Sequence, residues 1–189
     1  MEKNRETMNL LTTIYRHENV NTEGKTFFRE AVRGIIFRAL TSSPSPKGRG
    51  ELLIIYSSVN GDYKFPGGGI EAGELHEEAL RREIHEESGA RLTQVTGELG
   101  KTIEYANAFD DDFDTYKQVS YYYFCEINGE IGELDLDDYE EELGFQPIWV
   151  SIEQALEINR KVLAESNPAP WWTRREIFIL ELLQKRNRN

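Results

Sequence analysis

Apolar residues along the chain fall into two kinds of segment, and each kind predicts one type of element. Segments rich in β-branched and aromatic residues predict strands; they cover residues 26–40, 51–58, 63–65, 91–107, 116–127 and 148–150. Segments of helix-forming residues without internal Gly or Pro predict helices; they cover residues 75–88, 151–166 and 173–185. Strands and helices are interspersed rather than strictly alternating, which indicates a mixed sheet flanked by helices.

Short local signals predict where several of these elements begin and end. Asn60-Gly61 is typical of a tight turn between strands. Gly89 follows the helix predicted at 75–88 and is typical of a C-terminal cap. Thr173 and Glu176 have the spacing of a capping box, which would open the last helix.

The chain of 189 residues is long enough for one well-buried domain. Residues 1–25 are polar and mixed and predict an N-terminal arm or extension, with a short strand around Leu10–Tyr15. The Ser/Pro/Gly-rich segment 41–50 is short enough to be a hairpin loop rather than a domain boundary. We therefore expect one domain over residues 26–189, including the C-terminal helix.

A formal net charge of −12 and a pI near 4.8 limit the partners of the chain. An acidic surface argues against an electrostatic grip on a nucleic-acid polymer or an anionic membrane. A small phosphorylated substrate remains compatible, provided that a few Arg or Lys side chains or bound metal ions supply local positive charge. The sequence has no apolar run long enough to predict a membrane-spanning helix.

Cys125 is the only cysteine, so no intramolecular disulfide can form, and a buried place in a strand is its expected role. The N-terminal residues lack the long apolar region of a secretory signal. Both features favour the cytoplasm.

Three acidic residues, Glu83, Glu86 and Glu87, lie on one face of the helix predicted at 75–88. At about 100° per residue they share an arc of about 100° that also contains Ala79. Like charges at this spacing repel by roughly 0.2–0.5 kcal/mol per pair. Hard divalent cations such as Mg²⁺ and Mn²⁺ prefer carboxylate oxygens and would relieve that repulsion.

A solvated helix face is the alternative interpretation of these acids, because Glu77–Arg81 and Glu78–Arg82 are ordinary i,i+4 ion pairs. The stretch FPGGG, which ends at Gly69, favours the metal site instead. Glycines there allow unusual backbone angles, so that backbone groups can approach a metal-bound phosphate.

Residues 68–90 resemble the Nudix box, GX5EX7REUXEEXGU, in which U is a bulky apolar residue. All seven fixed letters match at the right spacing, and Ala90 is smaller than the usual final residue. The matching residues are Gly68, Glu74, Arg82, Glu83, Glu86, Glu87 and Gly89, with Ile84 at the first U. The resemblance implies an α/β/α sandwich around a mixed β-sheet.

The resemblance also implies an activity, which is hydrolysis of a diphosphate linkage in a small molecule joined to a nucleoside diphosphate, with Mg²⁺ or Mn²⁺. Carried over residue by residue, it makes Glu83, Glu86 and Glu87 metal ligands, assisted by the carbonyl of Gly67. Arg82 and Glu74 are expected to pair and to orient the loop and the helix.

The general base is expected to be either a box glutamate, with Glu83 as the candidate, or an acid from a later loop. Glu142 is the later candidate because it stands shortly before the QPIWV segment. The alternative for Glu142 is that residues 140–142 belong to a solvated acidic run.

The substrate class is less sharply indicated than the reaction. No proline lies between residues 67 and 146, unlike the pattern of ADP-ribose hydrolases, so a nucleoside triphosphate or a nucleotide sugar is the default expectation. A Nudix-fold sensor without catalysis is the alternative, although such proteins commonly lose the box acids. Dimers are frequent in the family, which leaves a homodimer open.

Two further features of the sequence have alternative interpretations. Arg33 is either a phosphate contact or a charge on an edge strand. Trp149, Trp171 and Trp172 are more typical of packing than of stacking on a base.

Overall fold

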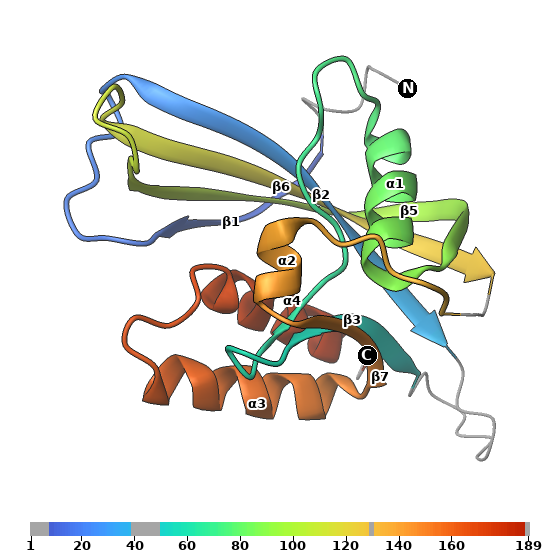
Figure 1. The fold of residues 1–189 in the computed structure, drawn as a ribbon. Helices are drawn as coiled ribbons and strands as arrows, with labels where there is room; N and C mark the ends of the chain where they lie inside the picture. The colour runs from blue at the N-terminus through green and yellow to red at the C-terminus, as the bar shows by residue number, and fades with distance from the viewer. Residues whose placement is uncertain (1–7, 39–49, 129–130, 188–189) are drawn as a thin grey trace.

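In the part of the chain that the structure describes, a mixed sheet of seven strands carries the fold, and helices pack on its two faces (Figure 1). The computed structural model describes residues 8–38, 50–128 and 131–187. The strands in these ranges are β1 Leu10–Tyr15, β2 Thr26–Arg38, β3 Glu51–Ser57, β4 Tyr63–Lys64, β5 Arg91–Asn107, β6 Thr115–Asn128 and β7 Phe145–Val150. The helices are α1 His76–Ser88, α2 Asp138–Glu142, α3 Ile152–Glu165 and α4 Thr173–Arg186.

The strand order is β1-β5-β6-β2-β3-β4, and β7 pairs with β3 outside this path. β1 runs parallel to β5 and β2 runs parallel to β6, whereas the other pairs are antiparallel. The predicted mixed sheet is therefore confirmed. β1 places part of the predicted N-terminal arm in the sheet, and the domain boundary after residue 25 stays a prediction.

Side chains on β2 alternate between two hydrophobic cores, because successive residues of a strand point to opposite faces. Val32 and Ile36 pack in the core that includes Leu80 and Ile84 of α1. Ile35 packs in the core formed with α3 and α4. Helices therefore cover opposite faces of the sheet, as Figure 1 shows for α1 against α3 and α4, and the predicted α/β/α arrangement is confirmed.

The capping box predicted at Thr173 and Glu176 is wrong. Trp172 is the residue before α4, and no side chain caps this helix end. Thr173 instead donates its hydroxyl to Asp62 Oδ2 at 3.0 Å, and the Glu176 carboxylate accepts the Phe65 N–H at 3.1 Å. Both side chains are fully buried, and buried polar groups need partners that tertiary neighbours supply here.

Most predicted elements are present, but the acidic segment 130–144 contains one that the sequence analysis did not predict. Residues Asp138–Glu142 form the short helix α2. The predicted loop at 41–50 lies outside the described residues except for Gly50. No helix in the described ranges is both long and apolar enough to cross a membrane.

Cys125 lies in β6 within the core against α1, as predicted, and is 5% exposed. Burial raises the pKa of its thiol to about 12. At neutral pH the reactive thiolate is therefore rarer than in an exposed cysteine by roughly a thousandfold.

We expect Cys125 to resist a thiol reagent such as DTNB in the native protein at pH 8 and to react completely after unfolding in guanidinium chloride. Absorbance of the released thionitrobenzoate measures both rates. Rapid stoichiometric reaction of the folded chain would contradict this placement.

Candidate active site

Helix α1 presents Glu83 and Glu87 toward the interior from adjacent turns. Ala79, Leu80 and Ile84 of this helix are fully buried against the sheet, which fixes the direction in which the two acids point. Glu83 is 8% exposed and Glu87 is fully buried. Glu86 lies farther out and is half-buried, so the three clustered acids of the sequence do not share one environment.

Glu140 of α2 completes a cluster with Glu83 and Glu87. One carboxylate oxygen of each residue lies within 4.8 Å of those of the other two. Burial, and then the charge of Glu87, raise the pKa of Glu140 to about 8. Burial and the charge of Glu87 also raise the pKa of Glu83. Three carboxylates this close repel one another unless a proton or a cation lies among them, and oxygen ligands of this kind fit Mg²⁺ or Mn²⁺.

Glu142 was the later acid expected near this site, but it is exposed at the end of α2 and outside the cluster. Glu140 takes that place because α2 begins with a capping box. Asp137 Oδ1 accepts the Glu140 N–H at 2.8 Å, and Glu140 Oε2 accepts the Asp137 N–H at 3.3 Å. The Asp-x-x-Glu spacing of Asp137 and Glu140 was the sequence signal that could have predicted this helix.

The acidic segment reaches the cluster along the C-terminal end of α1. Gly89 ends the helix at a φ of 66°. A Cβ at this position would lie 2.4 Å from the backbone of Gly132, so only glycine leaves room for the segment. The Gly132 N–H donates to the Ser88 carbonyl at 3.2 Å, and the Asp135 N–H donates to the Glu86 carbonyl at 2.9 Å.

The glycine loop after β4 contacts the cluster through its backbone. The Gly67 N–H donates to Glu87 Oε2 at 2.7 Å, and Glu87 Oε1 forms an ion pair with Lys64. Gly67 has a φ of 130°, and a Cβ there would lie 2.2 Å from the Val32 carbonyl oxygen. A Cβ at Gly68 would collide with the Glu83 carboxylate at 2.2 Å. Glycine is therefore required at residue 67, where the loop packs against the backbone of β2. The carbonyl of Gly67 as a metal ligand stays a prediction.

The predicted pair of Arg82 and Glu74 is present and is bidentate. Arg82 Nε and Nη2 each lie 2.9 Å from an oxygen of Glu74, and Nη2 also donates to the Gly69 carbonyl at 2.9 Å. Nη1 donates to Glu83 Oε1 at 2.8 Å and to Glu86 Oε2 at 3.1 Å. The hydrogen bonds from Arg82 lower the pKa of Glu74. One guanidinium thus ties the loop to the helix and orients two box acids.

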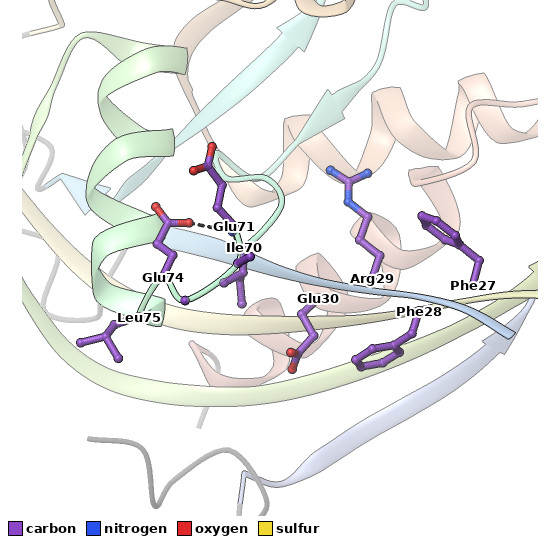
Figure 2. A pocket seen from close by; sticks show the side chains of 10 residues that line it. Phe27, Phe28, Arg29, Glu30, Ile70, Glu71, Glu74 and Leu75 are labelled. Carbon is purple, nitrogen blue, oxygen red and sulfur yellow. Dashed lines mark hydrogen bonds between the residues drawn. The ribbon is translucent and has the colours of Figure 1, made fainter.

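The loop that carries Glu74 also borders a hollow of about 530 Å³ beside β2. Figure 2 shows Phe27 and Arg29 on one side of β2 and Phe28 and Glu30 on the other. The Glu71 N–H donates to Glu74 Oε2 at 2.9 Å, the interaction drawn as a dashed line. Glu74 therefore braces the loop and, through Arg82, the middle of α1.

Helices α3 and α4 hold the strand that leads into the glycine loop. Asn159 of α3 accepts the Tyr63 N–H at 2.8 Å and donates to the Tyr63 carbonyl at 2.9 Å. Glu176 of α4 accepts the N–H of Phe65. These buried side chains replace a neighbouring strand for β4. Neither contact follows from the sequence, because the partners are distant in the chain.

A cavity of about 220 Å³ opens beside the carboxylates and carries both signs of charge. Its lining includes Arg29, Arg33, Lys64, Tyr139, Glu140 and Trp171. Arg33 is 4% exposed, and β2 pairs with β6 at this position. On the other side of the strand, the N–H groups of Val32 and Gly34 donate to carbonyls of the glycine loop, so the edge-strand interpretation of Arg33 is wrong. Trp172 is buried and donates to Asp62 at 2.7 Å, whereas Trp171 remains half-buried in the wall of this cavity.

Comparison with protein-family models matches residues 44–172 to the NUDIX domain. Two solved structures are similar in fold. The E. coli ORF135 protein is 20% identical at a TM-score of 0.46, with 70% of this chain and 80% of that chain covered. The mutator MutT protein from Bacillus halodurans is 21% identical at a TM-score of 0.47, with 69% of this chain and 72% of that chain covered. A comparison with curated proteins gave no match.

The raised pKa of Glu140 predicts how stability depends on pH in the cation-free protein. From about pH 4.5 to pH 8 the folded chain holds a proton that the unfolded chain has released, so the free energy of unfolding falls as pH rises. We expect the Glu140→Gln variant to lose stability less steeply over this range in EDTA. Urea unfolding at several pH values measures the slope.

Glu142→Gln is the matched control, because it removes the same charge from an exposed position of α2. It should keep the wild-type slope. Equal slopes for the two variants would refute the buried carboxylate cluster.

Proposed function

The chain belongs to the NUDIX domain family, and on that premise we propose that it hydrolyses a diphosphate linkage in a small nucleotide-type molecule with the help of Mg²⁺ or Mn²⁺. The observation that carries the proposal is the convergence of Glu83, Glu87 and Glu140 beside the glycine loop. Family membership supports the reaction class, and the donor set of three carboxylates supports the cation.

Glu83, Glu87 and Glu140 are the residues that would hold the cation, with Glu86 as the further box acid. When bound, the cation neutralises charge on the diphosphate and favours attack by water. Arg82 keeps Glu83 and Glu86 in place through its hydrogen bonds to both. The Gly67 N–H and Lys64 hold the Glu87 carboxylate in its buried position.

We assign the proton-accepting role outside the box to Glu140 rather than to Glu142. The Glu140 side chain lines the cavity beside the cluster, where an attacking water and the substrate would meet. It is not engaged by Arg82, whereas Glu83 is. A positioned carboxylate contributes roughly 10²–10⁴-fold to such a proton transfer. Glu83 remains the candidate base within the box.

A nucleoside triphosphate or a nucleotide sugar is the substrate that we propose first. The cavity supports this class because it combines cationic side chains for phosphate with the aromatic side chains of Tyr139 and Trp171. A non-catalytic nucleotide sensor is the alternative, and the complete set of box acids argues against it.

Release of phosphate and of nucleotide from a panel of nucleoside triphosphates and nucleotide sugars with Mg²⁺ tests the activity. We expect turnover of at least one member. Glu83→Gln, Glu87→Gln and Glu140→Gln should each lower kcat/KM by roughly 10²–10⁴-fold, because each removes a carboxylate from the cluster. Glu142→Gln should retain wild-type turnover.

Titration calorimetry with Mn²⁺ separates the sensor from the enzyme. Saturable Mn²⁺ binding together with inactivity on the whole panel would favour the sensor. Absence of Mn²⁺ binding, or binding that is unchanged in a Glu83→Gln/Glu87→Gln double variant, would remove the metal site.

A further inference from the structure

Arg33 is a buried guanidinium with hydrogen-bond donors that no described residue uses. Its side chain is 4% exposed, and neither Nε nor Nη1 has a hydrogen-bond partner within the ranges that the structure describes. A buried charge without partners is costly, and native proteins keep one where a ligand completes it. Burial, and then the neighbouring charge of Arg175, lower the pKa of Arg33, and the nearby acids Glu176 and Glu87 do not fully offset them.

Two other cationic groups that line the same cavity, Arg175 and Lys64, already have acidic partners. Arg175 Nη1 lies 2.6 Å from Glu104 Oε2, and its Nη2 lies 2.6 Å from Glu176 Oε1. Lys64 is paired with Glu87. Among these three cations, Arg33 is the one whose donors remain available to a ligand in the cavity.

Arg29 extends the positive charge from Arg33 toward solvent. Alternate residues of a strand share a face, so Arg29 and Arg33 lie on the same side of β2, about 13 Å apart along the strand. Figure 2 shows Arg29 projecting from that side. Its guanidinium also lies close to the glycine loop, since a Cβ added at Gly69 would be 3.1 Å from Arg29 Nη2. Both arginines line the cavity that Glu140 borders.

We propose that Arg33 binds a phosphoryl group of the substrate directly, so that the diphosphate spans the cavity from the carboxylate cluster to this guanidinium. The assignment rests on the proposed function and adds to it the residue that holds the part of the diphosphate farther from the carboxylates. A planar guanidinium donates two parallel hydrogen bonds to phosphate oxygens, which a compact ammonium cannot reproduce. Arg29 attracts the chain at the mouth of the cavity.

The role of Arg33 is tested by measuring the binding of inorganic diphosphate with titration calorimetry and with thermal melting. The measurements are made in EDTA and again with Mg²⁺. We expect the Arg33→Met variant to bind diphosphate roughly 10- to 100-fold more weakly than the wild type, because charge-assisted hydrogen bonds are lost. Its own melting temperature should stay level or rise, since an uncompensated buried charge is removed.

Arg174→Met is the matched control, because Arg174 is an exposed arginine of α4 that does not line this cavity. It removes the same charge and should bind diphosphate as the wild type does. Arg33→Lys serves if the Met variant does not fold, and it should also bind at least about tenfold more weakly. Affinity equal to that of Arg174→Met in either folded variant would overturn the assignment.

The outcome is distinguishable from failure of the proposed function. Mn²⁺ binding to Arg33→Met should be at least as tight as that of the wild type, because Arg33 supplies no ligand to the carboxylate cluster and its positive charge acts on Glu83. If the wild type hydrolyses no substrate but binds diphosphate, and Arg33→Met binds it more weakly, the Arg33 subsite stands and the proposed enzymatic activity is rejected. Failure of the wild type to bind diphosphate under both conditions would overturn the subsite itself, whatever the activity.

Discussion

Mutual repulsion among three clustered carboxylates, two of them buried, is the constraint around which the rest of the molecule is arranged. Glu83, Glu87 and Glu140 are brought together where little water can screen them. The structure offsets part of this cost with fixed partners, which are Arg82 on Glu83 and both Lys64 and the Gly67 N–H on Glu87. Glu140 receives no such cationic partner at hydrogen-bond distance among the described residues, and burial together with the charge of Glu87 raises its pKa to about 8. The negative charge that these partners leave uncompensated makes the site receptive to a cation.

Buried polar contacts from distant elements position the site, while the hydrophobic cores hold those elements together. Asn159 and Glu176 bind the backbone of residues 63 and 65, immediately before the glycine loop. Glu74 and Arg82 then fasten the loop to α1. The backbone of residues 63–69 is thereby held from both sides of the sheet. This rigidity keeps the Gly67 N–H of the glycine loop aligned toward the Glu87 carboxylate.

The sequence could predict the features of the site that depend on local spacing. The mixed sheet, the helix of residues 76–88 and its glycine cap follow from residue patterns. The Glu74–Arg82 pair follows from the resemblance of residues 68–90 to the family motif. The choice of Glu140 over Glu142 depends on which face of a short helix meets α1, which only tertiary packing decides. Thr173 and Glu176 had the spacing of a cap, but burial gave them partners more than a hundred residues away in the chain. Arg33 could not be distinguished from an edge-strand charge until the strand order was known.

Gly89 ends α1 and also admits the segment at Gly132 that leads to α2. Any larger side chain at residue 89 would push that segment away from the helix end, and with it the third acid of the cluster. The N–H groups of Gly132 and Asp135 satisfy carbonyls in the last turn of α1 that the helix itself leaves unpaired. Local opening of the acidic segment would therefore fray α1 at the turn that carries Glu86 and Glu87. Fraying of the helix end and loss of the third carboxylate would thus occur together. A cation that binds all three acids would therefore slow hydrogen exchange of amides in two segments that are some fifty residues apart in the chain.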